Sequence, residues 1–251
     1  MPCAVTMLCA TRAGVGRDRV RRMLGLLRRL RRRRASAAPE LDVAGAYERW
    51  AATYPADAHN PFMRSEQQVF EALLPSLAGK RVLDVACGSG RYLEHARAEG
   101  SAFACGLDAV PAMLARAKET HIPLVRGDMR ALPFGTSSFD VVTCGLAVGH
   151  VADLAAAIIE MARVLVPGGS LLYSDFHPFA YLAGARRMFR AGGSDYVVEH
   201  HVHLYAAHHA ACRAAGLEID GVLEALTLDG RQLPAVLVIR ARRTAAAPPT
   251  A

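Results

Sequence analysis

The chain contains a glycine-rich segment and three aspartates whose order is typical of adenosine binding. Asp84 lies in a short apolar run, and Gly88 and Gly90 follow it closely. Glycines allow the backbone to turn tightly and to approach a ligand closely. Asp108 closes the next apolar run, where a carboxylate can accept hydrogen bonds from both hydroxyls of a ribose. Asp128 follows a third run, where a carboxylate and a neighbouring amide can bind the edge of an adenine ring.

The motif also bears on which adenosine-containing cofactor is bound. A dinucleotide-binding fingerprint would read G-x-G-x-x-G, whereas residues 84–90 read D-x-x-C-G-x-G, with the aspartate inside the strand. A ribose-binding aspartate suits either class of cofactor. Asp128 and Met129 after the third run favour an adenosyl cofactor over a nicotinamide dinucleotide. A nicotinamide-dependent oxidoreductase is therefore the weaker hypothesis.

Alternating apolar runs and helical periodicity predict the elements that position these residues. Strands are expected over residues 81–85, 102–107, 122–125, 139–144 and 170–174. Helices are expected over residues 43–53, 65–77, 111–120, 153–166 and about 205–215, with another ending at residue 98. Two strand-like runs, 217–226 and 233–240, flank the turn signal Asp229-Gly230. The prediction is an α/β fold with a seven-stranded, mostly parallel sheet, an antiparallel C-terminal hairpin and helices on both faces.

These motifs resemble the class I S-adenosylmethionine-dependent methyltransferases over about residues 43–240. The resemblance is greatest to a small-molecule branch that includes the ubiquinone/menaquinone-biosynthesis and malonyl-carrier-protein methyltransferases. It implies a Rossmann-like fold, S-adenosyl-L-methionine as cofactor and a transferase activity of class EC 2.1.1. It also implies a cofactor-binding role for each of the following: Asp84, Ala86, Cys87, Gly88 and Gly90 toward the amino-acid end, Asp108 and Ala109 toward the ribose, Asp128 and Met129 toward the adenine, and Leu146 at the methyl-transfer site. Ala86 stands where the family most often has glycine.

The N-terminal helix resembles the lid of the same branch, in which aromatic side chains close over the sulfonium centre. Tyr47 and Tyr54 are the predicted lid aromatics, with ordinary helix packing as the alternative. An aromatic ring attracts a cation by about 0.5–2 kcal/mol. Trp50 is expected to pack within the amphipathic helix.

Two histidines are the candidate catalytic bases. His150 follows the fourth strand and His177 follows the fifth, so both are expected at the ligand-binding edge of the sheet. A general base would contribute about 10²–10⁴-fold if the acceptor is a hydroxyl or an acidic carbon, whereas a carboxylate acceptor needs none. A structural or surface role is the alternative for both histidines. The sequence predicts no metal site.

The remaining motifs restrict the acceptor. Residues 143–148 lack the Asn/Asp-Pro-Pro-aromatic signature of amino-group methylation, and the chain lacks the paired cysteine motifs of cytosine methylation. The irregular, His-rich segment 176–203 is expected to cap the acceptor pocket with an apolar wall, formed by Phe176, Phe179, Tyr181, Met188 and Phe189. The prediction is methyl transfer to an oxygen or carbon of a small, partly apolar metabolite. A non-catalytic S-adenosylmethionine-binding protein is the alternative, and the intact glycine-rich loop disfavours it.

The net charge of +7 comes from the Arg-rich extension, residues 1–38, because the domain expected over 39–251 is slightly acidic. This domain includes the lid (43–77) and the cap (176–203). Its slightly acidic charge predicts no nucleic-acid partner. Residues 17–34 have amphipathic periodicity. That periodicity is compatible with weak membrane-surface contact, a transit peptide, nucleic-acid contact or a disordered extension. Six scattered cysteines, and no apolar run of about 18 residues, predict a cytoplasmic protein. The oligomeric state is not predicted.

Overall fold

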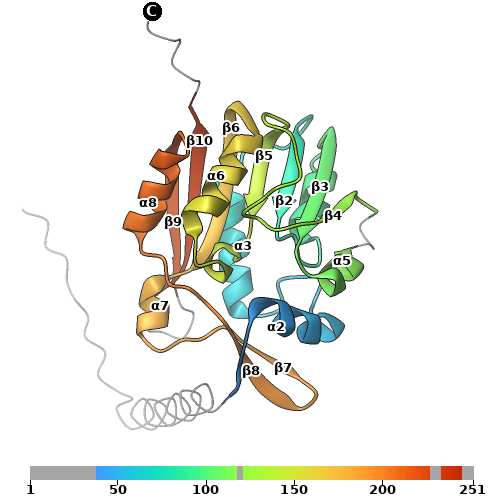
Figure 1. Cartoon of the computed structure of the whole chain (residues 1–251), viewed down its shortest axis with the longest axis vertical. Helices are drawn as coiled ribbons and strands as arrows, with labels where there is room; N and C mark the ends of the chain where they lie inside the picture. The colour runs from blue at the N-terminus through green and yellow to red at the C-terminus, as the bar shows by residue number, and fades with distance from the viewer. Residues whose placement is uncertain (1–37, 118–120, 227–232, 245–251) are drawn as a thin grey trace, which may run out of the picture.

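A seven-stranded sheet forms the centre of the molecule (Figure 1). The computed structural model describes residues 38–117, 121–226 and 233–244. The strand order is β4-β3-β2-β5-β6-β10-β9. The strands are β2 (Arg81–Val85), β3 (Phe103–Asp108), β4 (Leu124–Arg126), β5 (Phe139–Cys144), β6 (Leu165–Phe176), β9 (Leu217–Leu226) and β10 (Pro234–Arg243). Strands β2 to β6 are parallel, and β10 runs antiparallel to both of its neighbours. The predicted sheet with its C-terminal hairpin is confirmed.

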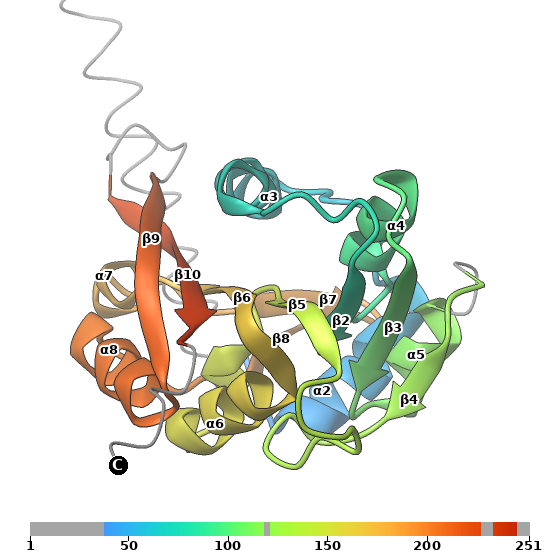
Figure 2. The same ribbon diagram turned by 90° about the horizontal axis from the view of Figure 1, so that it is seen from above.

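Helices cover both faces of the sheet, as predicted. Figure 2 shows α3 and α4 on one face and α6 and α8 on the other. The helices are α2 (Val43–Trp50), α3 (Pro61–Leu73), α4 (Arg91–Ala98), α5 (Pro111–Ala117), α6 (Leu154–Val164), α7 (Pro178–Leu182) and α8 (Tyr205–Ala214). Two short 3₁₀ helices cover Ala51–Thr53 and Val148–His150. Within the described ranges, every helix is too short or too polar to cross a membrane.

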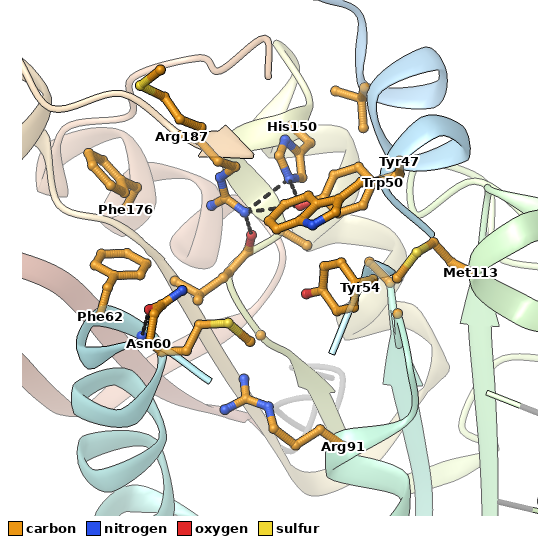
Figure 3. A pocket seen from close by; sticks show the side chains of 18 of the residues that line it. Tyr47, Trp50, Tyr54, Asn60, Phe62, Arg91, Met113, His150, Phe176 and Arg187 are labelled. Carbon is orange, nitrogen blue, oxygen red and sulfur yellow. Dashed lines mark hydrogen bonds between the residues drawn. The ribbon is translucent and has the colours of Figure 1, made fainter. Parts of the chain in front are cut away.

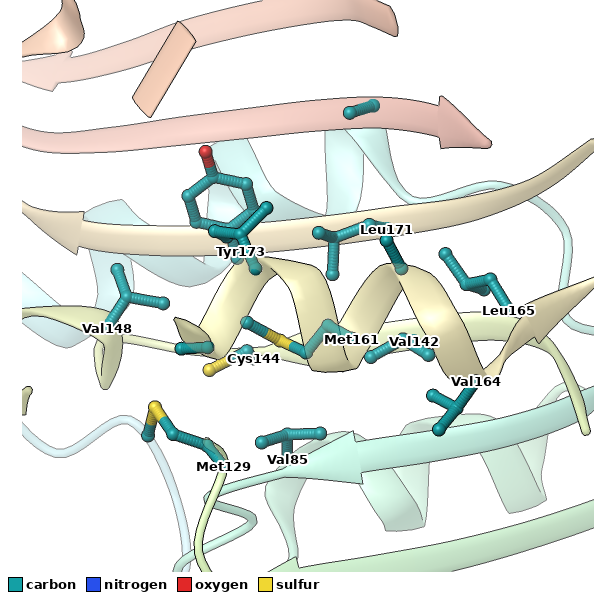
Figure 4. Packing of buried hydrophobic residues seen from close by; sticks show 14 of the residues in the cluster. Val85, Met129, Val142, Cys144, Val148, Met161, Val164, Leu165, Leu171 and Tyr173 are labelled. Atoms are coloured by element: carbon teal, nitrogen blue, oxygen red, sulfur yellow. The ribbon is translucent and has the colours of Figure 1, made fainter. Parts of the chain in front are cut away.

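The two sheet faces are packed because the central strands are apolar on both sides. Leu171 and Tyr173 of β6 pack in the same cluster as Met161 of α6 (Figure 4). The intervening Leu172 belongs to the cluster on the α3 face. This alternation of faces is the two-residue period of a strand, and burial on both faces is typical of a parallel sheet covered by helices.

Helix α3 begins earlier than its periodicity indicates. The prediction placed the helix over 65–77, after an irregular connection, but α3 starts at Pro61 and ends at Leu73. Asn60 caps it, since its side-chain oxygen accepts a hydrogen bond from the Met63 amide at 2.8 Å. Asparagine at the N-cap followed by proline at the first position is a helix-start signal. Pro61 is therefore part of the helix-start signal, whereas Pro55 lies in the irregular connection as predicted.

The segment 176–203 was predicted to be irregular, and this was wrong. It contains α7 and an antiparallel hairpin of β7 (Met188–Ala191) and β8 (Ser194–Val198). Strand β1 (Glu40–Leu41) pairs in parallel with β8 and completes a separate three-stranded sheet. The turn residues Gly192 and Gly193 have φ of 55° and 82°, which suits a two-residue hairpin turn. Figure 1 shows this hairpin beside α2.

Three predictions lie wholly or partly outside the described residues. They are the amphipathic segment 17–34, the last turn of the helix predicted over 111–120, and the hairpin turn Asp229-Gly230.

A buried carboxylate joins α3 to the rest of the domain. Glu66 of α3 is fully buried, and its Oε1 accepts hydrogen bonds from the hydroxyls of Tyr92 at 2.8 Å and Ser174 at 2.7 Å. Its Oε2 accepts from Nη2 of Arg91 at 2.8 Å. Ser174 in turn accepts from the Leu146 amide at 2.8 Å. One side chain thus connects α3, α4, the end of β6 and the loop after β5.

Replacement of Glu66 by alanine should destabilise the protein strongly. In Glu66→Ala, the Arg91 guanidinium would keep its charge in a largely buried place without its carboxylate partner. Removing one partner of a buried ion pair lowers the free energy of unfolding by about 3–5 kcal/mol. Urea denaturation followed by circular dichroism measures this loss. Gln68→Ala, at an exposed position of the same helix, is the control. Equal midpoints for the two variants would contradict the stabilising role of Glu66.

Candidate functional site

The main cavity opens at the edge of the sheet where the parallel strands end. Its volume is about 790 Å³, within the usual range for small-molecule sites. Each of the five parallel strands contributes a lining residue from its end or from the loop that follows: Ala86, Ala109, Met129, Leu146 and Phe176. Convergence at this edge is the usual arrangement of ligand sites in open α/β sheets.

Asp108 organises the first part of the cavity. It ends β3, and its Oδ2 accepts a hydrogen bond from the Gly88 amide at 2.9 Å. Its Oδ1 accepts from the Val110 amide at 2.9 Å. Burial raises the pKa of this carboxyl group, and the backbone hydrogen bonds oppose that effect. Each carboxylate oxygen can accept a further hydrogen bond, so Asp108 suits a ligand with adjacent hydroxyls.

A smaller cavity of about 40 Å³ lies next to the glycine-rich loop, and Asp84, Cys87, Gly88 and Arg91 are among its lining residues. Asp84 is buried within β2 and accepts a hydrogen bond from the Thr143 hydroxyl at 2.7 Å. Burial raises the pKa of Asp84 to about 7. A carboxylate and a guanidinium on one small cavity can hold the two ends of an amino-acid group.

Backbone strain marks the loops that follow β2 and β5. Ala86 and Leu146 both have φ of 54°, in the left-handed region that non-glycine residues seldom adopt. Such residues cluster at functional sites. Gly88 and Gly90 have φ of 57° and 89°, and Gly90 is the N-cap of α4. Glycine at position 86 would adopt this conformation without strain.

Aromatic side chains from the N-terminal segment form one wall of the cavity. Tyr47, Trp50 and Tyr54 all line it (Figure 3). Trp50 packs against Tyr54, with ring centroids 4.8 Å apart, and stacks on Phe189 of β7 at 4.9 Å. Burial raises the pKa of the Tyr54 phenol, so the group stays neutral. Trp50 therefore both packs in the helix, as predicted, and contributes to the cavity.

His150 is the one candidate base that the structure brings to the cavity. Its Nε2 lies 3.0 Å from the Tyr47 hydroxyl and 3.1 Å from Nη1 of Arg187. Because a guanidinium can only donate, Nε2 is the acceptor nitrogen, and the proton sits on Nδ1 beside the Glu199 carbonyl oxygen. Burial and the nearby Arg187 charge hold the pKa of His150 well below its usual value.

His177, the second candidate base, caps α7 and is not among the residues that line the cavity. Its Nδ1 accepts a hydrogen bond from the Phe179 amide at 3.1 Å, so its Nε2 donates to Glu224 at 3.1 Å. Among the predicted wall residues, Phe176 and Met188 line the cavity, whereas Phe179 is 58% exposed. Phe189 is buried against Trp50 instead.

The loop after β4 departs from the prediction in one respect. Gly127 and Met129 line the cavity, but the carboxylate of Asp128 does not and pairs with Arg130 at 2.6 Å. That pairing lowers the pKa of Asp128. Asp128 also accepts a hydrogen bond from the Arg130 amide at 2.8 Å, which fixes the local turn.

Sequence analysis missed several lining residues, and three of them bear on the chemistry of the cavity: Arg91, Phe62 and Arg187. Arg91 directly follows Gly90, and its place at the start of a helix beside the glycines could have signalled it. Phe62 reaches the cavity because α3 starts early. Arg187 lies in the segment predicted to be irregular, and no pattern in the sequence marks it. In the described part of the chain, no group of three His, Cys, Asp or Glu side chains could hold a metal ion.

Comparison with known proteins agrees with this geometry. Residues 83–173 match a family model described as a methyltransferase domain. The malonyl-[acyl-carrier protein] O-methyltransferase of Erwinia billingiae is 35% identical over 134 residues, which are 53% of this chain and 52% of that protein. The demethylmenaquinone methyltransferase of Corynebacterium efficiens is 39% identical over 99 residues, which are 39% of this chain and 42% of that protein. The chain thus spans about half the length of the curated relatives it matches.

A solved structure extends the comparison. An S-adenosylmethionine-dependent methyltransferase from Mesorhizobium loti has a TM-score of 0.61 and 28% identity, covering 71% of this chain and 98% of that one. The chain carries a class I S-adenosylmethionine-dependent methyltransferase domain. The residues of the two cavities fit the cofactor. In this methyltransferase domain, Asp108 offers acceptors for ribose hydroxyls, and Asp84 and Arg91 offer opposite charges for the amino-acid end.

Replacement of the strained Ala86 by glycine should stabilise the methyltransferase domain. Ala86→Gly relieves a left-handed conformation that costs an alanine about 1 kcal/mol, which exceeds the entropic cost of glycine in the unfolded chain. The free energy of unfolding should rise by the difference between these two effects, about 0.5 kcal/mol, in chemical denaturation. Ala98→Gly, at an exposed position in α4, should lower it by up to about 1 kcal/mol. A loss of stability in both variants would contradict the strain at Ala86.

Proposed function

We propose that this protein transfers a methyl group from S-adenosyl-L-methionine to an oxygen or carbon of a small, partly apolar metabolite. The observation that carries the proposal is the continuity of one cavity from Asp108 and Gly88 to an apolar region. That region is lined by Phe62 of α3 and Phe176 of β6, whose ring centroids lie 5.2 Å apart. A cofactor held at one end can then face an acceptor held at the other.

The cofactor, when bound, supplies a methyl group on a positively charged sulfur. The protein supplies binding and orientation. Asp108 would accept the ribose hydroxyls, and Asp84 and Arg91 would bind the ammonium and carboxylate groups. Met129 would pack on the adenine, with Asp128 fixing the turn that presents it. Tyr47 and Tyr54 would place aromatic faces near the sulfonium, which attracts them as a cation.

The partners follow from the same site. A cavity of this size with one apolar end suits a small-molecule acceptor. We infer no nucleic-acid substrate, because the net positive charge belongs to residues 1–38. Weak membrane contact through residues 17–34 and a cytoplasmic location stay predictions, supported by the charge pattern and by the four buried, unpaired cysteines of the described ranges.

Loss of either proposed cofactor-binding carboxylate should weaken cofactor binding strongly. Asp84→Ala and Asp108→Ala should each weaken the binding of S-adenosylhomocysteine on the order of 100-fold, because each removes charge-assisted hydrogen bonds in a buried site. Isothermal titration calorimetry on the full chain measures this, with NAD as the control ligand. Asp195→Ala, a surface aspartate on β8, is the matched control and should bind like the parent. Unchanged affinity in both cavity variants would refute the cofactor assignment.

Cofactor affinity should also rise with pH through neutrality. The ammonium group of the ligand binds the ionised form of Asp84, whose pKa without ligand is raised to about 7. An acid with a raised pKa is protonated below it, so binding must release a proton at low pH. Affinity for S-adenosylhomocysteine should therefore fall about tenfold per pH unit below 7 and level off above it. Calorimetry between pH 5.5 and 8.5 tests this, and Asp84→Asn should bind weakly without that slope. A flat profile in the parent protein would contradict the role of Asp84.

A further inference from the structure

One guanidinium in the cavity is only half satisfied. Nη1 of Arg187 donates to the Leu146 carbonyl oxygen at 2.7 Å, to His150 at 3.1 Å and to the Tyr47 hydroxyl at 3.3 Å (Figure 3). Its Nε and Nη2 are buried and have no hydrogen-bond partner within the described protein. Arginine carries five N–H donors, so three of them lack an acceptor. A buried donor without an acceptor is costly, and a charged one more so.

Within the described ranges, no carboxylate neutralises this charge at close range. None among the described residues lies within the 4.0 Å of an ion pair with Arg187. Asp175 is the buried acid that attracts it from further away, and burial raises the pKa of Asp175 to about 7, so much of it is protonated near neutral pH. The guanidinium is held in place by neutral acceptors alone, and its charge is left for another partner.

The other charged residues around the cavity also leave the positive charge of Arg187 without a partner. Arg91 is paired with Glu66, and Arg186 lies exposed over the Tyr181 ring. Asp108 is the only carboxylate among the described lining residues, and it accepts hydrogen bonds from two backbone amides. The part of the cavity around Arg187 is therefore positively charged, and its described lining includes no acid there. Such a site attracts an anion.

A base for the acceptor is also missing there. The acceptor nitrogen of His150 already faces Tyr47 and Arg187, and the nearby cation disfavours its protonation. The Tyr54 phenol is held neutral by burial. Among the described lining residues, no free imidazole or carboxylate remains near Arg187 to take a proton. An acceptor that arrives already deprotonated needs no such group.

Apolar side chains adjoin the charged group. Phe62 and Phe176 line the cavity together with Leu226 and Ala235 from the C-terminal strands. We propose that the acceptor is an apolar carboxylic acid, bound as its carboxylate to Arg187 and methylated on that carboxylate. This inference rests on the proposed function, because the methyl group comes from S-adenosyl-L-methionine.

The reaction then balances without proton transfer. A lone pair of the acceptor carboxylate oxygen forms the new bond to the methyl carbon, while the bond from that carbon to sulfur breaks and its electron pair stays on sulfur. The charged carboxylate becomes a neutral methyl ester, and the sulfonium becomes a neutral thioether. The ester pairs less well with Arg187 than the acid did, which favours its release.

The test compares carboxylates with neutral counterparts of the same shape. Octanoate, phenylacetate and benzoate are each paired with their primary amides and titrated into full-length protein saturated with S-adenosylhomocysteine. Trp50 is the single tryptophan of the chain and lines the cavity, so its fluorescence reports binding, with calorimetry as the second readout. At least one acid should bind at least tenfold more tightly than its amide, because a charge-assisted pair replaces a neutral one.

Two arginine variants separate binding from general charge effects. Arg187→Gln, compared with the parent protein at saturating S-adenosylhomocysteine, should reduce the acid-to-amide preference to within about twofold. Arg190→Gln removes the same charge from an exposed position on β7 and should keep the preference. If Arg187 had only a structural role, Arg187→Gln would lower the free energy of unfolding but would not change the acid-to-amide preference. The comparison within the parent protein needs no variant, so poor folding of Arg187→Gln would not leave the proposal untested.

A chemical readout tests the methylated atom. With S-adenosylmethionine labelled in its methyl group, the acid that binds most tightly should acquire label that base releases as methanol, as expected of a methyl ester. No acid-over-amide preference in protein that binds S-adenosylhomocysteine would overturn the carboxylate proposal and leave the methyltransferase assignment intact. Acid binding without base-labile label would overturn the carboxylate as nucleophile. No binding of S-adenosylhomocysteine at all would overturn both.

Discussion

The buried carboxylate of Glu66 is the interaction on which the site depends. It receives donors from α4 and β6, and through Ser174 it also positions the loop after β5. A buried charge is tolerated only when such partners surround it. The consequence is that Arg91, which lines both cavities, and Leu146, which lines the main one, are held by one group. Core packing alone would not fix their relative positions so closely.

Local signals in the sequence were sufficient for the sheet and for several residues that its strand ends place on the cavity. Asp84 lies one residue before the end of β2 and Asp108 ends β3, and strand ends converge wherever such a parallel sheet forms. The placement of Gly88 and Ala109 on the cavity follows from the same topology. All five parallel strands point the same way, so the loops that follow them reach the same edge of the sheet. Strand direction was therefore enough to place these residues at that edge, without knowledge of the packing between distant segments.

The acceptor end could not be predicted in the same way, because packing between distant segments decides it. His150 and His177 have equivalent positions after neighbouring strands, yet α7 uses His177 as its cap, and only His150 reaches the cavity. Arg187 directly precedes the β7–β8 hairpin, whose second strand pairs with β1, far away in the sequence. Residues 176–203 show no clear strand pattern in the sequence. Apolar residues of the hairpin pack against α2, and not against the central sheet, so the usual pattern of a sheet strand is missing.

The two ends of the cavity also differ in charge, and this difference gives His150 a role other than that of a base. A neutral imidazole is a good acceptor for a guanidinium, whereas a protonated one would repel it. The burial that keeps the pKa of His150 low therefore also keeps Arg187 in place, together with the Tyr47 hydroxyl and the Leu146 carbonyl oxygen. His150 is best understood as a positioning residue: it orients the cation, and the cation can then select the acceptor.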